Sequence, residues 1–209
     1  MIRLVIFDFD GTIVDSRAAY YNSITKHLIP KGFDKKRIAE VIDLGLNLGE
    51  TLRKFIPSRI YRWWVRREIM KDVLNEASKV RKCHDASHIG DIHTKKILVS
   101  NSLSEFVLPV LSHFKMRKLF REVYCADDFD DKTQFIRMYL KMHGIRPHEC
   151  FYVGDRAADV RIAKKIKCNS IIVSGRCSWN SRDELLKAKP DFIVPGLGDI
   201  KRIVDRFKP

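Results

Sequence analysis

The amino-acid sequence predicts an α/β protein built on a doubly wound parallel sheet, with a small α-helical domain inserted after the first strand. Three observations support this prediction. Short, continuous apolar runs alternate with helix-like segments from residue 86 onward, as expected for parallel strands that are buried on both faces. The N-terminal run at residues 3–7 is of the same kind. Residues 15–85 show only helical periodicity, which places a helical unit between the first strand and the others.

The elements of the predicted sheet follow from the apolar runs and from the residues that bound them. Gly144 closes one helix because glycine suits the left-handed conformation after a helix, and Ser181 begins another by capping its first turn. Strands are expected at residues 3–7, 97–99, 123–125, 151–153, 171–173 and 192–194, and helices at 103–114, 132–143, 157–166, 182–188 and 197–207. Parallel strands with helices on both faces form a Rossmann-like core.

The insert is expected to be a small bundle of helices. The first runs from about residue 16 to 29, with apolar residues four positions apart. Capping residues begin the other three helices: Asp34, then Asn47 for a helix that ends before Pro57, and Ser58 for the longest one. That longest helix carries an apolar stripe of Val65, Ile69, Val73 and Ala77. The sequence thus divides into a core of residues 1–14 and 86–209 and an inserted domain of residues 15–85.

The chain has a globular composition and a strongly basic charge. Of its 209 residues, 45% are hydrophobic and 32% are charged, a balance that suits a folded domain. The net charge of +14 attracts anions, which include phosphorylated metabolites, nucleic acids and membrane surfaces. Residues 15–85 are densely positive, with 16 Lys and Arg against 9 Asp and Glu. No nucleic-acid-binding motif is recognisable, so a solvated basic surface is favoured, and nucleic acid remains an alternative partner.

Three features of the sequence favour a cytoplasmic protein. Asp8 and Asp10 interrupt the first apolar run too early for a signal peptide, and no uncharged stretch approaches the roughly 20 residues of a membrane span. The five cysteines are an odd number and include no CxxC pair, which favours free thiols in a reducing compartment. We therefore expect no membrane contact and free cysteines, and the oligomeric state stays open.

Asp8 and Asp10 lie in the segment Asp8-Phe9-Asp10-Gly11-Thr12, directly after the first apolar run. Residues two positions apart in a strand share one face, so the two carboxylates would repel each other and lose hydration. A packed domain tolerates this arrangement when a cation lies between the charges, and a divalent metal with a phosphate is the natural candidate. A pair of aspartates that caps an ordinary strand-to-helix turn is the alternative.

Polar residues also follow the next three strands. Open parallel sheets bind ligands beyond the carboxyl ends of their strands. Ser100 and Asn101 come after the second strand, Lys132 comes after the acidic run that follows the third, and Asp155 and Asp159 come after the fourth. Together with the first pair of aspartates, these residues supply a metal site, a phosphate clamp and a nucleophile at one edge of the sheet.

The aspartates suit different steps of phosphoryl transfer. Asp8, at the tip of a strand, is placed to attack phosphorus, and Asp10, on the loop beyond, is placed to protonate the leaving alcohol and then activate water. Mg²⁺ prefers about six hard oxygen ligands, and Asp8, Asp155 and the backbone carbonyl of Asp10 would supply three of them. Asp159 lies one helical turn beyond Asp155 and is expected to orient metal-bound water or to support a ligand. The expected cofactor is Mg²⁺.

Phosphate oxygens require hydrogen-bond donors and positive charge. The Ser100 hydroxyl with the neighbouring Asn101, and the backbone N–H groups near Gly11 and Thr12, are expected to bind the phosphoryl oxygens. Lys132 would neutralise charge on the nucleophile and on the phosphate together, which is the positioning and electrostatic work that phosphoryl transfer demands.

The order of these motifs resembles the haloacid dehalogenase superfamily of phosphohydrolases. Residues 8–16, Asp-Phe-Asp-Gly-Thr-Ile-Val-Asp-Ser, and residues 152–160, Tyr-Val-Gly-Asp-Arg-Ala-Ala-Asp-Val, are similar to its first and fourth motifs. The resemblance covers nearly the whole chain and is strongest to the phosphoglycolate phosphatase-like branch, which carries a helical cap domain. It implies a Mg²⁺-dependent phosphatase acting on a small phosphate monoester through an aspartyl-phosphate intermediate, with Asp8 as nucleophile and Asp10 as general acid/base.

Some residues depart from the family pattern or bear on the substrate. Residues 132–135, Lys-Thr-Gln-Phe, stand where Lys-Pro-x-Pro is usual, and Arg156 replaces a residue that is commonly small. Residues 44–50 are similar to a cap segment that faces the substrate, and Arg17 and Asn47 are candidate substrate contacts from the cap. A phosphomutase of the same superfamily is one alternative function, and a nucleotide or nucleic-acid end phosphatase that uses the basic cap is another.

Overall fold

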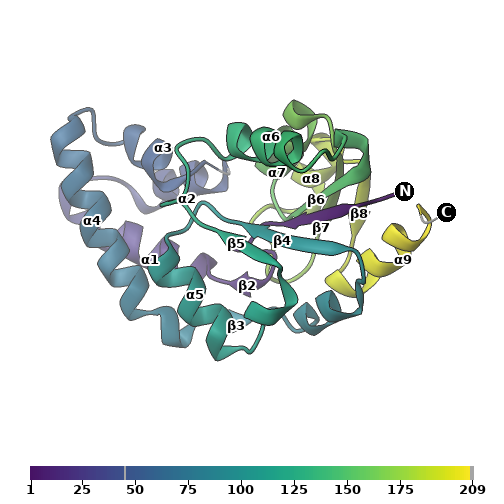
Figure 1. Cartoon of the computed structure of the whole chain (residues 1–209). Coiled ribbons are helices and arrows are strands. Elements are labelled where there is room, and N and C mark those ends of the chain that lie inside the picture. Colours follow the sequence, from purple (N-terminus) through teal and green to yellow (C-terminus); the bar gives the residue numbers. More distant parts are fainter. Residues whose placement is uncertain (45, 208–209) are drawn as a thin grey trace.

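The computed structural model describes residues 1–44 and 46–207, so Gly45 of the 44–50 segment and the last two residues of the expected core lie outside the described residues. A six-stranded parallel sheet has the strand order β5-β4-β1-β6-β7-β8 (Figure 1). Its strands are β1 Leu4–Phe7, β4 Lys95–Val99, β5 Glu122–Tyr124, β6 Cys150–Gly154, β7 Asn169–Val173 and β8 Phe192–Val194. The predicted doubly wound α/β fold is confirmed.

Helices cover both faces of this sheet. They are α5 Ser104–His113, α6 Lys132–Met142, α7 Ala157–Ile166, α8 Arg182–Lys187 and α9 Ile200–Asp205. Successive strand residues point to opposite faces, so Leu4 and Ile6 of β1 pack in one hydrophobic cluster with α6 and α7, whereas Val5 and Phe7 pack in another with α5 and α9. All four side chains are fully buried. Burial on both faces explains why the strands are continuous apolar runs.

The expected helical insert is also present. Its helices are α1 Arg17–Leu28, α2 Lys35–Asp43, α3 Leu48–Arg53 and α4 Arg59–Asn75, with α1 packed against α2 and α4, and α3 packed against α4. These helices lie beside the sheet rather than over its centre (Figure 1). The side chains of Asp34, Asn47 and Ser58 accept hydrogen bonds from the backbone N–H three residues later, which confirms them as helix caps.

Some short elements differ from the prediction. The two-residue strands β2 Val14–Asp15 and β3 Arg81–Lys82 pair antiparallel, so the chain leaves and re-enters the core at one place. Neither strand is long enough to show a period in the sequence. Ala77 lies in a 3₁₀ turn after α4, and the expected helix 197–207 begins as a 3₁₀ turn, Leu197–Asp199, before α9. Further 3₁₀ turns span Ile29–Lys31, Ala86–Asp91, Arg117–Leu119 and Pro147–Glu149.

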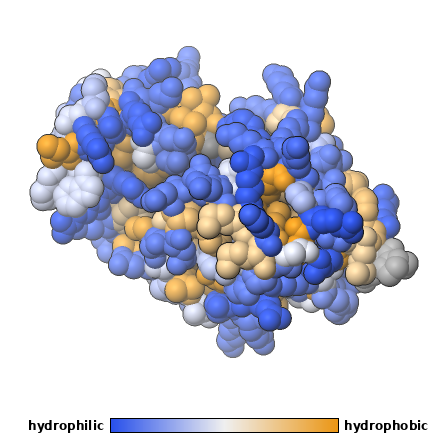
Figure 2. All heavy atoms as spheres, turned by 45° about the horizontal axis from the view of Figure 1, so that its top comes forward, coloured by the Kyte–Doolittle hydropathy of each residue, from blue (hydrophilic) through white to orange (hydrophobic). Residues whose placement is uncertain are grey.

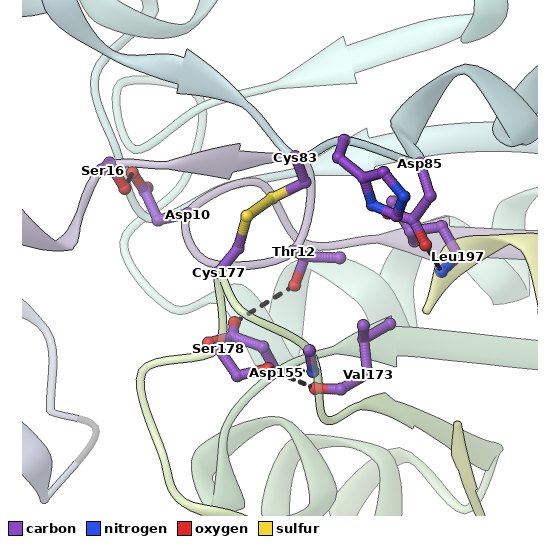
Figure 3. The surroundings of a disulfide bond; sticks show 12 residues. Asp10, Thr12, Ser16, Cys83, Asp85, Asp155, Val173, Cys177, Ser178 and Leu197 are labelled. Atoms are coloured by element: carbon purple, nitrogen blue, oxygen red, sulfur yellow. Dashed lines mark hydrogen bonds and ion pairs between the residues drawn. A yellow bond between two sulfur atoms is a disulfide. The ribbon is translucent and has the colours of Figure 1, made fainter. Parts of the chain in front are cut away.

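The expectation of free cysteines is wrong at two positions. Cys83, which follows β3, forms a disulfide with Cys177 in the loop after β7, across a sequence separation of 94 residues (Figure 3). Cys125, Cys150 and Cys168 are free and buried. An odd cysteine count without a CxxC pair could not show this bond, because only the tertiary fold brings the two thiols together. The bond ties the re-entry point of the chain to a loop at the carboxyl edge of the sheet.

Reduction of this disulfide is expected to lower thermal stability. A cross-link across a long loop restricts the unfolded chain and typically contributes about 2–4 kcal/mol, which corresponds to about 4–16 °C in Tm for a domain of this size. Thermal unfolding with and without dithiothreitol measures the change. The double variant Cys83→Ser/Cys177→Ser is the control, since its Tm should not respond to the reductant. Five reactive thiols in the denatured, unreduced protein would contradict the bond.

The surface of the described residues is largely polar. Most of the face shown in Figure 2 is hydrophilic, with apolar residues scattered among the charged ones. No helix within residues 1–44 and 46–207 combines the length and the apolar character that crossing a membrane requires.

Candidate active site

A cavity of about 340 Å³ lies at the carboxyl edge of the sheet. One wall is formed by residues that follow β1, β4, β5, β6 and β7, and the opposite wall comes from α1, α4 and residues 46–51 of the insert. This is where an open parallel sheet binds its ligands. Of the predicted site residues, Asp8, Asp10, Lys132, Asp159, Asn101 and Asn47 line this cavity.

Asp8 and Lys132 form a buried ion pair. Asp8 follows the last residue of β1, Lys132 is the first residue of α6, and the Lys132 Nζ lies 2.5 Å from the Asp8 Oδ1. Both side chains are largely buried, at 12% exposure for Asp8 and 5% for Lys132. The substitution of the usual prolines around this lysine therefore leaves it beside Asp8. An ammonium at this place can offset the charge of the carboxylate and of an incoming phosphate.

Three carboxylates gather at one point beside this ion pair. Oxygen atoms of Asp8, Asp155 and Asp159 lie within 4.8 Å of one another. Burial raises the pKa of Asp155 well above its ordinary value, and burial followed by the Asp8 charge raises the pKa of Asp159 to about 6. Like charges this close, away from water, repel each other, and a cation between them relieves this repulsion and favours the ionised carboxylates. Carboxylate oxygens are the ligands that Mg²⁺ prefers, so the donor set fits this metal.

Asp155 and Asp159 are fixed by hydrogen bonds from their neighbours. The Thr12 hydroxyl donates to Asp155 at 3.1 Å (Figure 3), and the Trp179 backbone N–H donates to its other oxygen at 2.7 Å. Asp159 accepts from the N–H groups of Asp155 and Arg156 at 3.1 and 2.9 Å, and so caps the first turn of α7. Both carboxylates are thereby held in place before any ligand binds.

Gly11 allows the tight turn that brings these groups together. Its φ of +79° lies in the left-handed region that glycine adopts without strain. A Cβ at this position would lie 2.3 Å from the Asp155 Oδ2 and 2.4 Å from the Trp179 Cδ1. Any side chain here would push apart the loops that carry the acidic cluster.

Asp10 lies in a different environment from the acidic cluster. The Ser16 hydroxyl donates to one carboxylate oxygen at 2.6 Å, and the Ser102 hydroxyl donates to the other at 2.5 Å. Because the Ser102 hydroxyl proton is used in its bond to Asp10, the Tyr20 hydroxyl is the donor in its own bond to Ser102, at 2.6 Å. Burial raises the pKa of Asp10, whereas the two serine hydrogen bonds oppose the rise. A carboxyl group held this way is suited to give and take a proton.

The residues expected to bind phosphate occupy different positions. Asn101 is exposed and lines the cavity. Ser100 is buried, and its hydroxyl accepts from the Ser102 backbone N–H at 3.0 Å. The backbone N–H groups of Gly11 and Thr12 were expected to bind phosphate, but in the structure they donate to the carbonyl oxygens of Val14 and Phe9 at 2.8 and 3.3 Å, because the tight turn after β1 uses them itself.

The two candidate contacts from the cap also differ. Arg17 forms an ion pair with Asp43 at 2.6 Å and lines a separate, more open hollow. Asn47 lines the cavity beside the acidic cluster, and its side chain is engaged as the cap of α3 through Glu50. Arg17 is therefore not brought to the cavity, whereas Asn47 is.

Several site residues were missed from the sequence. From the sequence, Ser16 could be recognised only as a helix cap. Its side chain makes no capping hydrogen bond, and its hydroxyl donates to Asp10 instead. Tyr20 carries no sequence signal of its own, whereas Ser102 directly follows Ser100 and Asn101 beyond the second strand and could have been included with them. Trp179 did have one, since it lies beyond the carboxyl end of the fifth strand in sequence, where the rule that located the other residues also applies.

Comparison with known proteins identifies the same family as the order of the motifs. Residues 5–173 match the family of haloacid dehalogenase-like hydrolases. A phosphoglycolate phosphatase of Photorhabdus laumondii is 24% identical over 95% of this chain and 91% of its own length. Among solved structures, a haloacid dehalogenase-like hydrolase of Streptococcus pneumoniae aligns with a TM-score of 0.80, 15% identity and 99% coverage of both chains.

A second solved structure contains a ligand. It is a mutant of CbbY from Rhodobacter sphaeroides in complex with xylulose-1,5-bisphosphate, and it aligns with a TM-score of 0.76, 14% identity and coverage of 95% of this chain and 96% of its own. At this identity the likeness shows a shared fold. The family predicted from the motif order is confirmed: the chain belongs to the haloacid dehalogenase-like hydrolases.

Proposed function

We propose that the chain is a Mg²⁺-dependent phosphatase that hydrolyses a small phosphate monoester, with phosphoglycolate as the first candidate. The observation that carries this proposal is the meeting of Asp8 with Lys132 on one side and with Asp155 and Asp159 on the other. The names of the relatives support the substrate class, since one is a phosphoglycolate phosphatase and one structural neighbour is bound to a sugar bisphosphate.

The reaction would proceed in two steps at Asp8. A carboxylate oxygen of Asp8 attacks phosphorus, the bond from phosphorus to the alcohol oxygen breaks, and Asp10 gives its proton to the leaving alkoxide. Asp10 then takes a proton from water, whose oxygen attacks phosphorus; the bond from phosphorus to the Asp8 oxygen breaks, which regenerates the carboxylate and releases inorganic phosphate. Lys132 holds the phosphoryl group against Asp8 throughout. Mg²⁺ held by Asp8, Asp155 and the Asp10 backbone carbonyl would neutralise charge on the phosphoryl oxygens.

Product analysis tests this function. The protein, supplied with Mg²⁺ and 2-phosphoglycolate, is expected to release glycolate and inorganic phosphate in equal amounts. A phosphomutase would instead keep the phosphoryl group on the organic product. An end phosphatase would act on a 5′-phosphorylated oligonucleotide in preference to small esters, with a steep dependence on salt. Absence of phosphate release across a panel of phosphorylated metabolites would refute the proposal.

Replacing Asp10 with Asn is expected to lower kcat for phosphoglycolate by about two to four orders of magnitude, because the amide cannot exchange the proton. The loss in kcat/KM, which reports the steps up to phosphoryl transfer to Asp8, should be smaller for p-nitrophenyl phosphate, because its leaving group does not need protonation. Steady-state kinetics on both esters measure this difference. Asp183→Asn, in the exposed first turn of α8, is the matched control. Equal losses on the two esters would speak against the acid role of Asp10.

A further inference from the structure

Arg156 lies in the wall of the cavity and stacks on an aromatic ring. It is the residue between Asp155 and α7, it is half-buried, and it lines the cavity. Its guanidinium carbon lies 3.5 Å from the centroid of the Trp179 ring. Trp179 is itself buried and packs against Tyr20 of α1, with 5.7 Å between ring centroids. The arginine therefore rests on a rigid aromatic platform, which limits the side-chain freedom it would lose on binding a ligand.

Apart from its contact with the Trp179 ring, the guanidinium of Arg156 has no charged partner among the described residues. Within residues 1–44 and 46–207, no carboxylate lies within ion-pair distance of its guanidinium, although Asp10 and Asp159 line the same cavity. Lys132, the other cation from the core wall, is already engaged by Asp8. A half-buried guanidinium that keeps its fork of donors open is suited to bind a planar or tetrahedral anion.

The size of the cavity limits where such an anion can lie. About 340 Å³ is enough for a small molecule, and the phosphoryl group would occupy the end beside Asp8 and Lys132. Arg156 is close enough to the catalytic acids that its charge lowers the pKa of Asp10, Asp155 and Asp159, against the effect of burial. An anion bound by Arg156 would thus belong to the same small substrate as the phosphate.

We propose that Arg156, resting on Trp179, is a specificity-determining residue that binds a second anionic group of the substrate, a carboxylate or a second phosphate a few bonds from the scissile phosphate. This inference rests on the proposed phosphatase function. It assigns substrate selection in part to the core, through the loop after β6, and explains why a large cation stands in a motif where a small residue is usual. Arg66, on α4 across the cavity, adds positive charge on the opposite wall.

Two related esters, one with a carboxylate where the other has a methyl group, test the assignment. 2-Phosphoglycolate and ethyl phosphate differ by one carboxylate, so the ratio of their kcat/KM values isolates the recognition of that group. A charge-assisted hydrogen bond is worth about 10- to 100-fold in this ratio, and we expect Arg156→Gln to remove that preference. A second pair, ethanediol bisphosphate and 2-hydroxyethyl phosphate, shows whether the group is a phosphate instead. The preferred pair identifies the anion.

Control variants separate substrate binding from general electrostatics. Arg161→Gln removes the same charge from the exposed surface of α7 and should leave the ratio unchanged. Arg156→Lys keeps the charge without the fork and should retain part of the preference, and it also serves as the test variant if the Gln variant does not fold. If Arg156→Gln lowers kcat/KM equally for both esters of a pair, Arg156 supports the acidic cluster and the inference is wrong.

The kcat/KM values of the wild-type protein separate failure of the proposed phosphatase function from failure of the proposed role of Arg156. Hydrolysis of every ester with equal kcat/KM would leave the phosphatase function standing and overturn the role of Arg156. Hydrolysis of none of the four esters and of no member of the metabolite panel would remove the proposed function, and this inference with it.

Discussion

Replacing Asp8 with Asn is expected to lower kcat by at least about four orders of magnitude on any phosphate ester. An amide is not a nucleophile toward phosphorus, and loss of a covalent nucleophile removes the route through the intermediate instead of slowing one step of it. The surroundings of Asp8 favour this role, because Lys132 holds one oxygen at 2.5 Å and the residue follows a rigid, buried strand. Steady-state hydrolysis of p-nitrophenyl phosphate measures the effect.

The Asp8→Asn variant also separates the nucleophile from the metal ligand. The side-chain amide carbonyl of this variant would still offer one hard oxygen, and the substitution relieves repulsion with Asp155 and Asp159. We therefore expect the variant to fold and to respond to Mg²⁺ while it fails to turn over. Asp183→Asn, on the surface of α8, controls for a general effect of losing a carboxylate. Undiminished hydrolysis by the Asp8→Asn variant would refute the mechanism.

The sheet and the helix caps could be predicted because their signals are local. The burial of Leu4 to Phe7 on both faces of the sheet leaves a continuous apolar run in the sequence. Asp34 and Ser58 cap helices through bonds to residues three positions away. The rule that ligands bind beyond the carboxyl ends of parallel strands then placed Asp8, Lys132 and Asp159 around one cavity.

The features that could not be predicted are hydrogen bonds and a disulfide whose partners are brought together by the tertiary fold. Ser16 has a capping site within reach, but its hydroxyl bonds to Asp10 instead. The sequence assigned no partner to the Thr12 hydroxyl, which in the structure donates to Asp155, 143 residues away in the sequence. Short polar side chains have several possible acceptors, and only the assembled fold decides which is nearest. The disulfide of Cys83 with Cys177 belongs to the same class.

Mg²⁺ is expected to be required for turnover and to stabilise the folded protein. With the metal chelated, the charge of Asp8, Asp155 and Asp159 is offset by the protein's own cations, Lys132 directly and Arg156 at longer range, and no divalent ion is left to neutralise the phosphoryl oxygens, so we expect phosphate release to fall to background. Mg²⁺ at about 100 times its Kd should add about 2.7 kcal/mol to the free energy of unfolding, or about 5–10 °C in Tm. The measurement belongs at about pH 7.5, where the carboxyl of Asp159, with a pKa of about 6, is ionised.

The stability readout tests the metal site independently of catalysis. Asp155→Asn is expected to lose most of the rise in Tm with Mg²⁺, because a neutral amide binds the cation less strongly and the cluster carries one charge fewer. Asp130→Asn is the matched control, since Asp130 lines the same cavity but does not belong to the cluster. It should keep the rise. An equal rise in both variants would place the metal away from Asp155, and full turnover in the presence of a chelator would show that the carboxylates serve another purpose.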